Sequence, residues 1–117
     1  MKQIRVQMPM PDNHNAVADF VRLKTAHRAS AILRTLDRSP GHKVNNSVLL
    51  DWLRSIALVS TRDELSAAIN GLERLGLIKT ETLEGLIVLE LSERGQNVAL
   101  GRETADGVLQ PSPECSY

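Results

Sequence analysis

The sequence predicts a mainly α-helical domain that carries one small β-hairpin. Apolar residues recur every three or four positions in three stretches, a Ser-Pro-Gly break separates the first two, and two adjacent β-prone runs follow. The chain has 117 residues, 42% of them hydrophobic and 24% charged, which suffices for one domain with one core. Because no run of about 18 apolar residues occurs, we expect no membrane span.

The first helix is predicted over residues 16–36. Its apolar face consists of residues spaced three and four apart, namely Phe20, Leu23, Ala26 or His27, Ala29 or Ser30, Leu33 and Leu36. The run Ser39-Pro40-Gly41 ends it, because proline and glycine interrupt helices. His27 lies at the edge of this face, where we interpret it as a packed residue rather than a ligand.

The second helix follows a short extended stretch at 42–44. Asn46 is its predicted N-cap, and its apolar stripe comprises Val48, Leu49, Trp52, Leu53 and Ile56. We expect Trp52 to pack in the core. Phe20 and Tyr117 are the only other aromatic residues, so the sequence predicts no stacking platform for single-stranded nucleic acid.

The third helix has the clearest predicted start. Ser60 and Asp63 are spaced as in a capping box, with Asp in place of the usual Glu or Gln. Its buried stripe is predicted to contain Leu65, Ala68 or Ile69, Leu72 and Leu75. Gly76 suits the left-handed position that ends many helices.

A hairpin and a short helix complete the predicted domain. The strands cover 77–82 and 86–91, joined by Leu83-Glu84-Gly85, and Ser92 caps a helix over 93–100 that Gly101 ends. This order of elements predicts a winged helix-turn-helix, with the third helix at about 61–75 and the wing at about 77–91. The domain would span 16–101, between an N-terminal arm at 1–15, containing a short strand, and a C-terminal tail at 102–117.

Charge is divided unevenly along the chain, although the net charge is zero. Residues 1–62 contain ten Lys or Arg and four Asp, whereas residues 63–117 contain four Lys or Arg and ten Asp or Glu. Such polarity is typical of a nucleic-acid face or a head-to-tail association, but the two halves could also neutralise each other within the fold.

One part of the chain is similar to the end of the recognition helix, the wing and the following helix of bacterial winged-helix regulators. It consists of Leu72-Glu73-Arg74-Leu75-Gly76-Leu77-Ile78, then the hairpin, then Leu91-Ser92-Glu93-Arg94-Gly95. More narrowly, the chain resembles small ArsR-like proteins of Mu-like transposable phages and prophages. This resemblance is carried by His27-Arg28, Ile32-Leu33-Arg34, Pro40-Gly41-His42, Asn45-Asn46-Ser47-Val48-Leu49 and the segment 101–111. The resemblance covers about 27–113 and implies a DNA-binding or phage-regulatory role. Metal-sensing members need soft ligands, yet Cys115 is the single cysteine and the three histidines lack ligand spacing, so we expect neither metal nor cofactor.

Candidate DNA contacts lie mainly on the outward positions of the third helix. Arg62, Ser66 and Asn70 could read base edges, and Thr61 and Arg74 could contact phosphates. Lys43 before the second helix and Lys79 on the wing are further candidates. The alternative is that these are ordinary solvated side chains, because acidic residues share both elements, namely Asp63, Glu64, Glu73, Glu81, Glu84 and Glu90.

Two functions remain open. The first is a cytoplasmic, DNA-binding regulator of a phage or prophage, working as a homodimer through its arm, first helix or tail. The alternative is a winged-helix adaptor that binds a phage or host protein in packaging or assembly and does not bind DNA. The sequence contains none of the common catalytic motifs, such as G-x-S-x-G or H-E-x-x-H, so we do not expect an enzyme. A single cysteine favours a reducing compartment.

Overall fold

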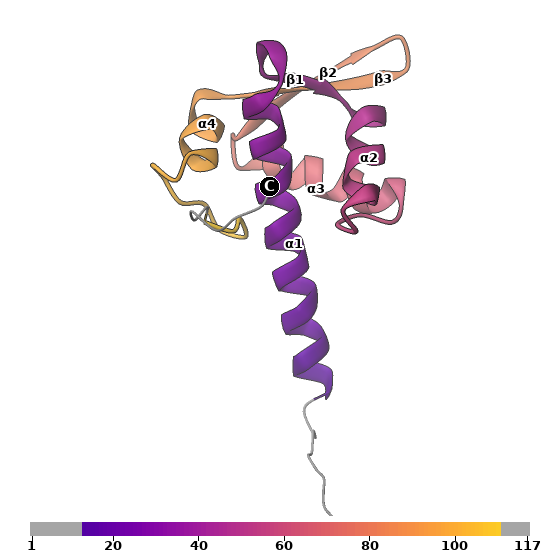
Figure 1. The fold of residues 1–117 in the computed structure, drawn as a ribbon, viewed down its shortest axis with the longest axis vertical. Helices are drawn as coiled ribbons and strands as arrows, with labels where there is room; N and C mark the ends of the chain where they lie inside the picture. Colours follow the sequence, from indigo (N-terminus) through magenta and orange to yellow (C-terminus); the bar gives the residue numbers. More distant parts are fainter. Residues whose placement is uncertain (1–12, 111–117) are drawn as a thin grey trace, which may run out of the picture.

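The computed structural model describes residues 13–110, with side chains from residue 16 onward (Figure 1). This part of the chain is mainly helical and carries a small antiparallel sheet, as the sequence predicts. In chain order the elements are α1 (Asn13–Arg38), the 3-10 turn η2 (Pro40–His42), β1 (Lys43–Asn45), α2 (Asn46–Ser55), α3 (Arg62–Arg74), β2 (Ile78–Leu83), β3 (Leu86–Leu91) and α4 (Glu93–Ala99). The strand expected in the N-terminal arm and the end of the tail lie outside the described residues.

The sheet has the strand order β1-β3-β2, with both pairings antiparallel. Leu89 in the central strand lies opposite Val44 of β1 and Thr80 of β2, and its side chain is fully buried. Since side chains alternate along a strand, Glu90 lies on the other face, opposite Lys43 and Lys79. The sheet therefore has one face on the core and one facing solvent.

The core is built around the second half of α1. Residues 28–33 of this helix are all buried, so every side of it is covered there. The largest fully buried apolar side chains come from α1, α2 and the sheet region: Ile32, Leu33, Leu36, Leu49, Leu53, Leu77 and Leu89. From α3, the buried residues Leu65, Ile69 and Leu72 complete the cluster, which confirms the stripe predicted for that helix, and Leu75 is partly buried against it.

The first half of α1 departs from the prediction. Phe20 and Leu23 belong to the apolar face predicted for this helix but are 64% and 54% exposed. The helix begins at Asn13, and its first turns extend away from the other elements (Figure 1). The amphipathic spacing was read correctly as a helix, but spacing cannot tell whether the rest of the chain reaches far enough to cover it. The predicted helix is confirmed, whereas the described residues do not cover the first part of its apolar face.

The cap of α2 lies one residue earlier than predicted. Asn45, not Asn46, is the N-cap, and its side-chain oxygen accepts a hydrogen bond from the backbone N–H of Val48 at 2.9 Å. Asn46 instead accepts a hydrogen bond from the backbone N–H of Ile87 at 3.2 Å. The two neighbouring asparagines thus have different roles, the first ending β1 and starting α2, and the second tying α2 to β3.

The capping box of α3 lies one residue later than predicted. Thr61 accepts from the backbone N–H of Glu64, and the Glu64 carboxylate accepts from the backbone N–H of Thr61, each at 3.1 Å. The prediction used Ser60 and Asp63. The longer Glu side chain is the usual partner in this motif because it can reach back to the cap.

Two glycines stand where the backbone needs positive φ. Gly76 (φ +76) follows the C-cap of α3, and its N–H donates to the Glu73 carbonyl. Gly85 (φ +84) forms the two-residue hairpin turn with Glu84, whose φ is also positive. Both positions confirm the predicted ends of α3 and of the hairpin strands, although Leu83 belongs to β2 rather than to the turn.

Trp52 was expected in the core, and that prediction was wrong. It is 40% exposed, and its indole N–H donates to the Thr35 hydroxyl at 3.1 Å. Val48, one turn earlier on the same face, is 58% exposed. Leu49 and Leu53 of the predicted stripe are buried, together with Leu50, so the buried side of α2 is rotated about the helix axis away from Val48 and Trp52.

The segment after α4 returns to the body of the protein. The N–H of Leu109 donates to the Ala26 carbonyl on α1 at 3.1 Å, and Ala105 and Val108 pack against the core. Residues 102–110, assigned to a tail from the sequence, therefore contribute to packing.

Candidate nucleic-acid interface

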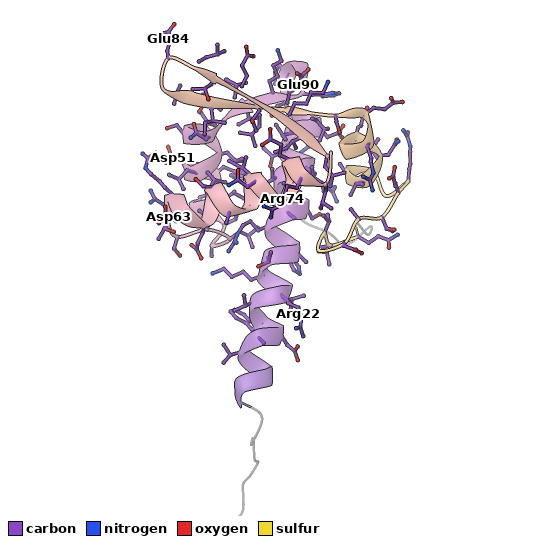
Figure 2. The ribbon with its side chains drawn as sticks, turned by 180° about the vertical axis from the view of Figure 1, so that it is seen from behind. Arg22, Asp51, Asp63, Arg74, Glu84 and Glu90 are labelled. Atoms are coloured by element: carbon purple, nitrogen blue, oxygen red, sulfur yellow. The ribbon has the colours of Figure 1, made fainter. Side chains whose placement is uncertain are left out.

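The outward face of α3 gathers the residues predicted to read DNA. Arg62, Ser66 and Asn70 are all exposed, and at 100° per residue they fall within an arc of about 80°. Arg74 lies at the other end of the helix, about 18 Å along the axis from Arg62. Figure 2 shows this separation through the labelled Asp63 and Arg74. The helix thus presents one polar face over its whole length.

Thr61 has a structural role at the start of this helix. Its hydroxyl oxygen accepts the hydrogen bond from Glu64 described above, so the side chain is held against the first turn. The residue is exposed, and the free N–H groups of the first helical turn lie beside it. A phosphate could be held there by backbone N–H groups as well as by the hydroxyl.

Two of the three carboxylates that weigh against DNA binding on α3 have partners within the fold. Glu64 accepts from the backbone N–H groups of Ser60 and Thr61 and lies 3.6 Å from the Arg28 guanidinium. These backbone hydrogen bonds lower the pKa of the Glu64 carboxyl below its usual value. Glu73 accepts a hydrogen bond from the Thr80 hydroxyl at 2.8 Å. The carboxylate of Asp63 is the acidic group left on the exposed first turn.

Arginine side chains hold the turn between α2 and α3. Arg54 is exposed, and its Nε donates to the Ser60 carbonyl at 3.2 Å, which places a guanidinium next to the start of α3. Arg54 is one of the ten basic residues in the first 62, and nothing in the sequence places it beside the candidate site. Arg28, another of these basic residues, is only 8% exposed, and its Nε donates to the Leu58 carbonyl at 2.6 Å. Arg28 is therefore part of the scaffold.

Lys43 and Lys79 come together on the outer face of the sheet. Both lie opposite Glu90 of β3, one from each neighbouring strand. They line a shallow hollow of about 270 Å³ with Thr80, Glu81, Val88 and Glu90. Because Thr80 faces α3 through Glu73, the adjacent Lys79 points to the opposite side of the sheet. The predicted residues thus form two groups, one on α3 and one on the sheet.

The hairpin tip is acidic and apolar rather than basic. Glu84 lies at the turn, as labelled in Figure 2, and Leu83 and Leu86 are 50% and 40% exposed. Glu81 is exposed on β2. Such a tip offers no cation to phosphate, so any contribution of the hairpin to a duplex would come from its base, where Lys79 lies.

Other classes of site are not seen in residues 13–110. No helix there is long and apolar enough to span a bilayer. Within the same residues, no three His, Cys, Asp or Glu side chains gather in a way that could hold a metal ion.

Comparisons with known proteins relate the chain to a phage. No family model and no solved structure matches it. It is 36% identical over 89 residues to a protein of Escherichia phage Mu described as "Uncharacterized protein gp26". The match covers 76% of this chain and 92% of the phage protein. The Mu-like origin suggested by the sequence is thereby confirmed, while the ArsR-like assignment stays a prediction. The chain belongs to the family of phage Mu gp26.

Proposed function

We propose that the protein is a winged helix-turn-helix regulator of a Mu-like phage or prophage, located in the cytoplasm, that binds double-stranded DNA with α3. In this assignment α2 and α3 form the helix-turn-helix, and β2 and β3 form the wing. The turn between the helices, residues 56–61, is longer than the three or four residues common in this motif.

The outward face of α3 is the observation that carries the proposal. Arg62, Ser66 and Asn70 are exposed on one arc, and these side-chain types pair with guanine, either base, and adenine, respectively. Arg54 adds a positive charge at the same end of the helix. The Arg28 guanidinium, 3.6 Å from the Glu64 carboxylate, offsets one of the negative charges on α3, whereas Glu73 keeps its full charge.

The small number of cations limits the affinity. Arg54, Arg62 and Arg74 are near α3, and Lys43 and Lys79 lie on the sheet, so each chain offers few phosphate contacts. Each contact contributes about 0.9 to the slope of log K against log salt. We therefore expect a shallow salt dependence and useful affinity only when two chains bind one duplex together.

The test is binding to duplex fragments of the phage genome at low and physiological salt, measured by fluorescence anisotropy. Arg62→Ala and Asn70→Ala should each weaken binding at particular bases by roughly 1–3 kcal/mol. Lys43→Ala should weaken binding to all sequences alike and reduce the slope by about one unit. Arg102→Ala is the matched control, because Arg102 is exposed after α4 and outside the candidate site.

Absence of duplex binding would decide against the proposed DNA-binding function. If no duplex binds at low salt, the proposal fails. Capture of a defined phage or host protein that depends on the hairpin residues Glu81, Glu84 and Glu90 would then favour the adaptor function. Equal losses for Arg62→Ala and Arg102→Ala would show that binding is non-specific and does not use α3.

A further inference from the structure

The first half of α1 carries an apolar face that nothing in the described part of the chain covers. We call residues 13–24 the overhang, since they extend beyond the other elements (Figure 1). Every side chain from residue 16 to 23 is exposed. The four large apolar ones are Val17, Phe20, Val21 and Leu23, each between 54% and 64% exposed. Exposure of this size over consecutive turns of one helix indicates a binding surface.

The overhang is apolar on one side only. At 100° per residue, the apolar residues Ala16, Val17, Phe20, Val21 and Leu23 occupy about 160° of its circumference, and Lys24 falls within the same arc at the end nearest the body. Asp19 and Arg22 lie outside this arc and form an ion pair with each other. Figure 2 shows Arg22 projecting from the overhang into solvent. A surface with one apolar and one charged side suits a single helix-sized partner.

The size of this face matches half of a small interface. The four side chains expose on the order of 400 Å² together, as large as the main apolar patch of a typical monomer. Two such faces in contact, with the polar groups beside them, approach the ~1,000 Å² expected of a specific association. Within the overhang, Asn, Asp, Phe and Val are weak helix formers, so a partner would also hold the helix together.

The face is complementary to itself when two copies run antiparallel. With Phe20 placed against the second copy's Phe20, Val17 lies against the second copy's Leu23 and Ala16 against the second copy's Lys24. The side chains are thus complementary in size: Val17 lies against the larger Leu23, and the small Ala16 leaves room for the long Lys24. A parallel pair would instead place Lys24 against Lys24, which like charge disfavours. In the antiparallel pair the two bodies also lie at opposite ends.

We propose that the overhang is the homodimer interface, in which the first halves of two α1 helices pack antiparallel around Phe20. Lys24, the last residue of the overhang, lies four residues or about 6 Å from Phe20, so in this register the two bodies begin about 12 Å apart along the helix axis and on opposite sides of Phe20. This inference rests on α1 alone and does not depend on DNA binding by α3.

The first test is the molar mass of the full chain by sedimentation equilibrium. We expect a dimer at micromolar concentration, and Phe20→Glu should raise its dissociation constant at least about 30-fold. Val48→Glu is the matched control, because Val48 is an apolar helix residue of similar exposure on α2. Since residue 20 is outside the core, the circular dichroism of the body should persist in the Phe20→Glu variant.

The second test reads the register by disulfide formation in a Cys115→Ser background. Phe20→Cys should oxidise to a linked dimer. Val17→Cys alone should not, but a mixture of Val17→Cys and Leu23→Cys chains should, because these positions face each other only in the antiparallel pair. Cross-linking of Val17→Cys with itself would overturn the antiparallel arrangement. A wild-type chain that stays monomeric at high concentration would overturn the dimer and leave the face to another partner or to residues 1–12.

Discussion

The two halves of α1 have the same periodicity and opposite surroundings. From residue 28 to 33 every side chain is buried, whereas from 16 to 23 every side chain is exposed. Leu33 and Leu36 are completely covered by the other elements, while Phe20 and Leu23 are more than half exposed. A single continuous helix thus serves first as an outward surface and then as the centre of the core.

This difference teaches that one amphipathic pattern can serve two purposes. In the second half, apolar residues are buried by the same chain and stabilise the fold. In the first half they contribute little to the stability of the isolated chain, and the proposed dimer would bury them. Arg28 marks the boundary, since it is the buried arginine at which α1 enters the body.

The largest contrast is expected between two leucines of this helix. Leu36→Ala should lower the free energy of unfolding by about 2–5 kcal/mol, because it leaves a cavity in a closed core. Leu23→Ala should change it by less than about 0.5 kcal/mol at concentrations where the chain is monomeric. Urea denaturation followed by circular dichroism measures both values, and similar losses for the two variants would remove the distinction between the halves.

Arg28 in the buried half of α1 and Arg22 in the exposed half should also differ in their contribution to stability, by less than the two leucines do. Arg28→Ala removes the 2.6 Å hydrogen bond to the Leu58 carbonyl and the ion pair with Glu64, so we expect a loss of about 1–3 kcal/mol. Arg22→Ala breaks an ion pair between exposed groups and should have little measurable effect, since water and salt screen such pairs. An Arg28→Ala variant as stable as wild type would show that the turn after α2 is not held by α1.

A smaller effect on stability is expected from pH through Glu64, the ion-pair partner of Arg28. Hydrogen bonds from the backbone N–H groups of Ser60 and Thr61 lower the pKa of Glu64 below its usual value of 4.5. The folded state therefore takes up this proton less readily than the unfolded chain. The resulting stability is present above pH 4.5 and is lost as the pH falls through the lowered pKa.

Glu64→Gln should remove that contribution. We expect the stability difference between wild type and Glu64→Gln to be largest at neutral pH and to shrink as the pH falls below 4.5, as measured by thermal unfolding in a series of buffers. A difference that stays constant with pH would contradict the assigned role of the carboxylate.

Much of the fold was predictable because it depends on local chemistry. Ser92 as a cap, Gly76 after α3 and the hairpin turn at Gly85 follow from backbone needs that few residues can meet. Caps with two neighbouring candidates were missed by one residue, at Asn45 and Thr61, because the choice depends on which side chain reaches the free N–H groups in space.

The candidate site was predictable in composition but not in arrangement. The sequence identifies Arg62, Ser66 and Asn70 as one helix face. It does not reveal that the Glu73 carboxylate accepts a hydrogen bond from the Thr80 hydroxyl. Nor does it reveal that Lys43 and Lys79 flank Glu90 on the solvent face of the sheet, because both contacts join separate elements. The exposure of Phe20 was unpredictable for the same reason.

Amide hydrogen exchange at two protein concentrations tests the contrast between the halves of α1 most directly. If the overhang pairs with a second copy, exchange at residues 17–23 should slow at least about tenfold between low and high micromolar protein, with a smaller change at residues 30–36. Exchange at residues 17–23 that is fast and independent of concentration would contradict the account, because it would show a helix half that remains uncovered.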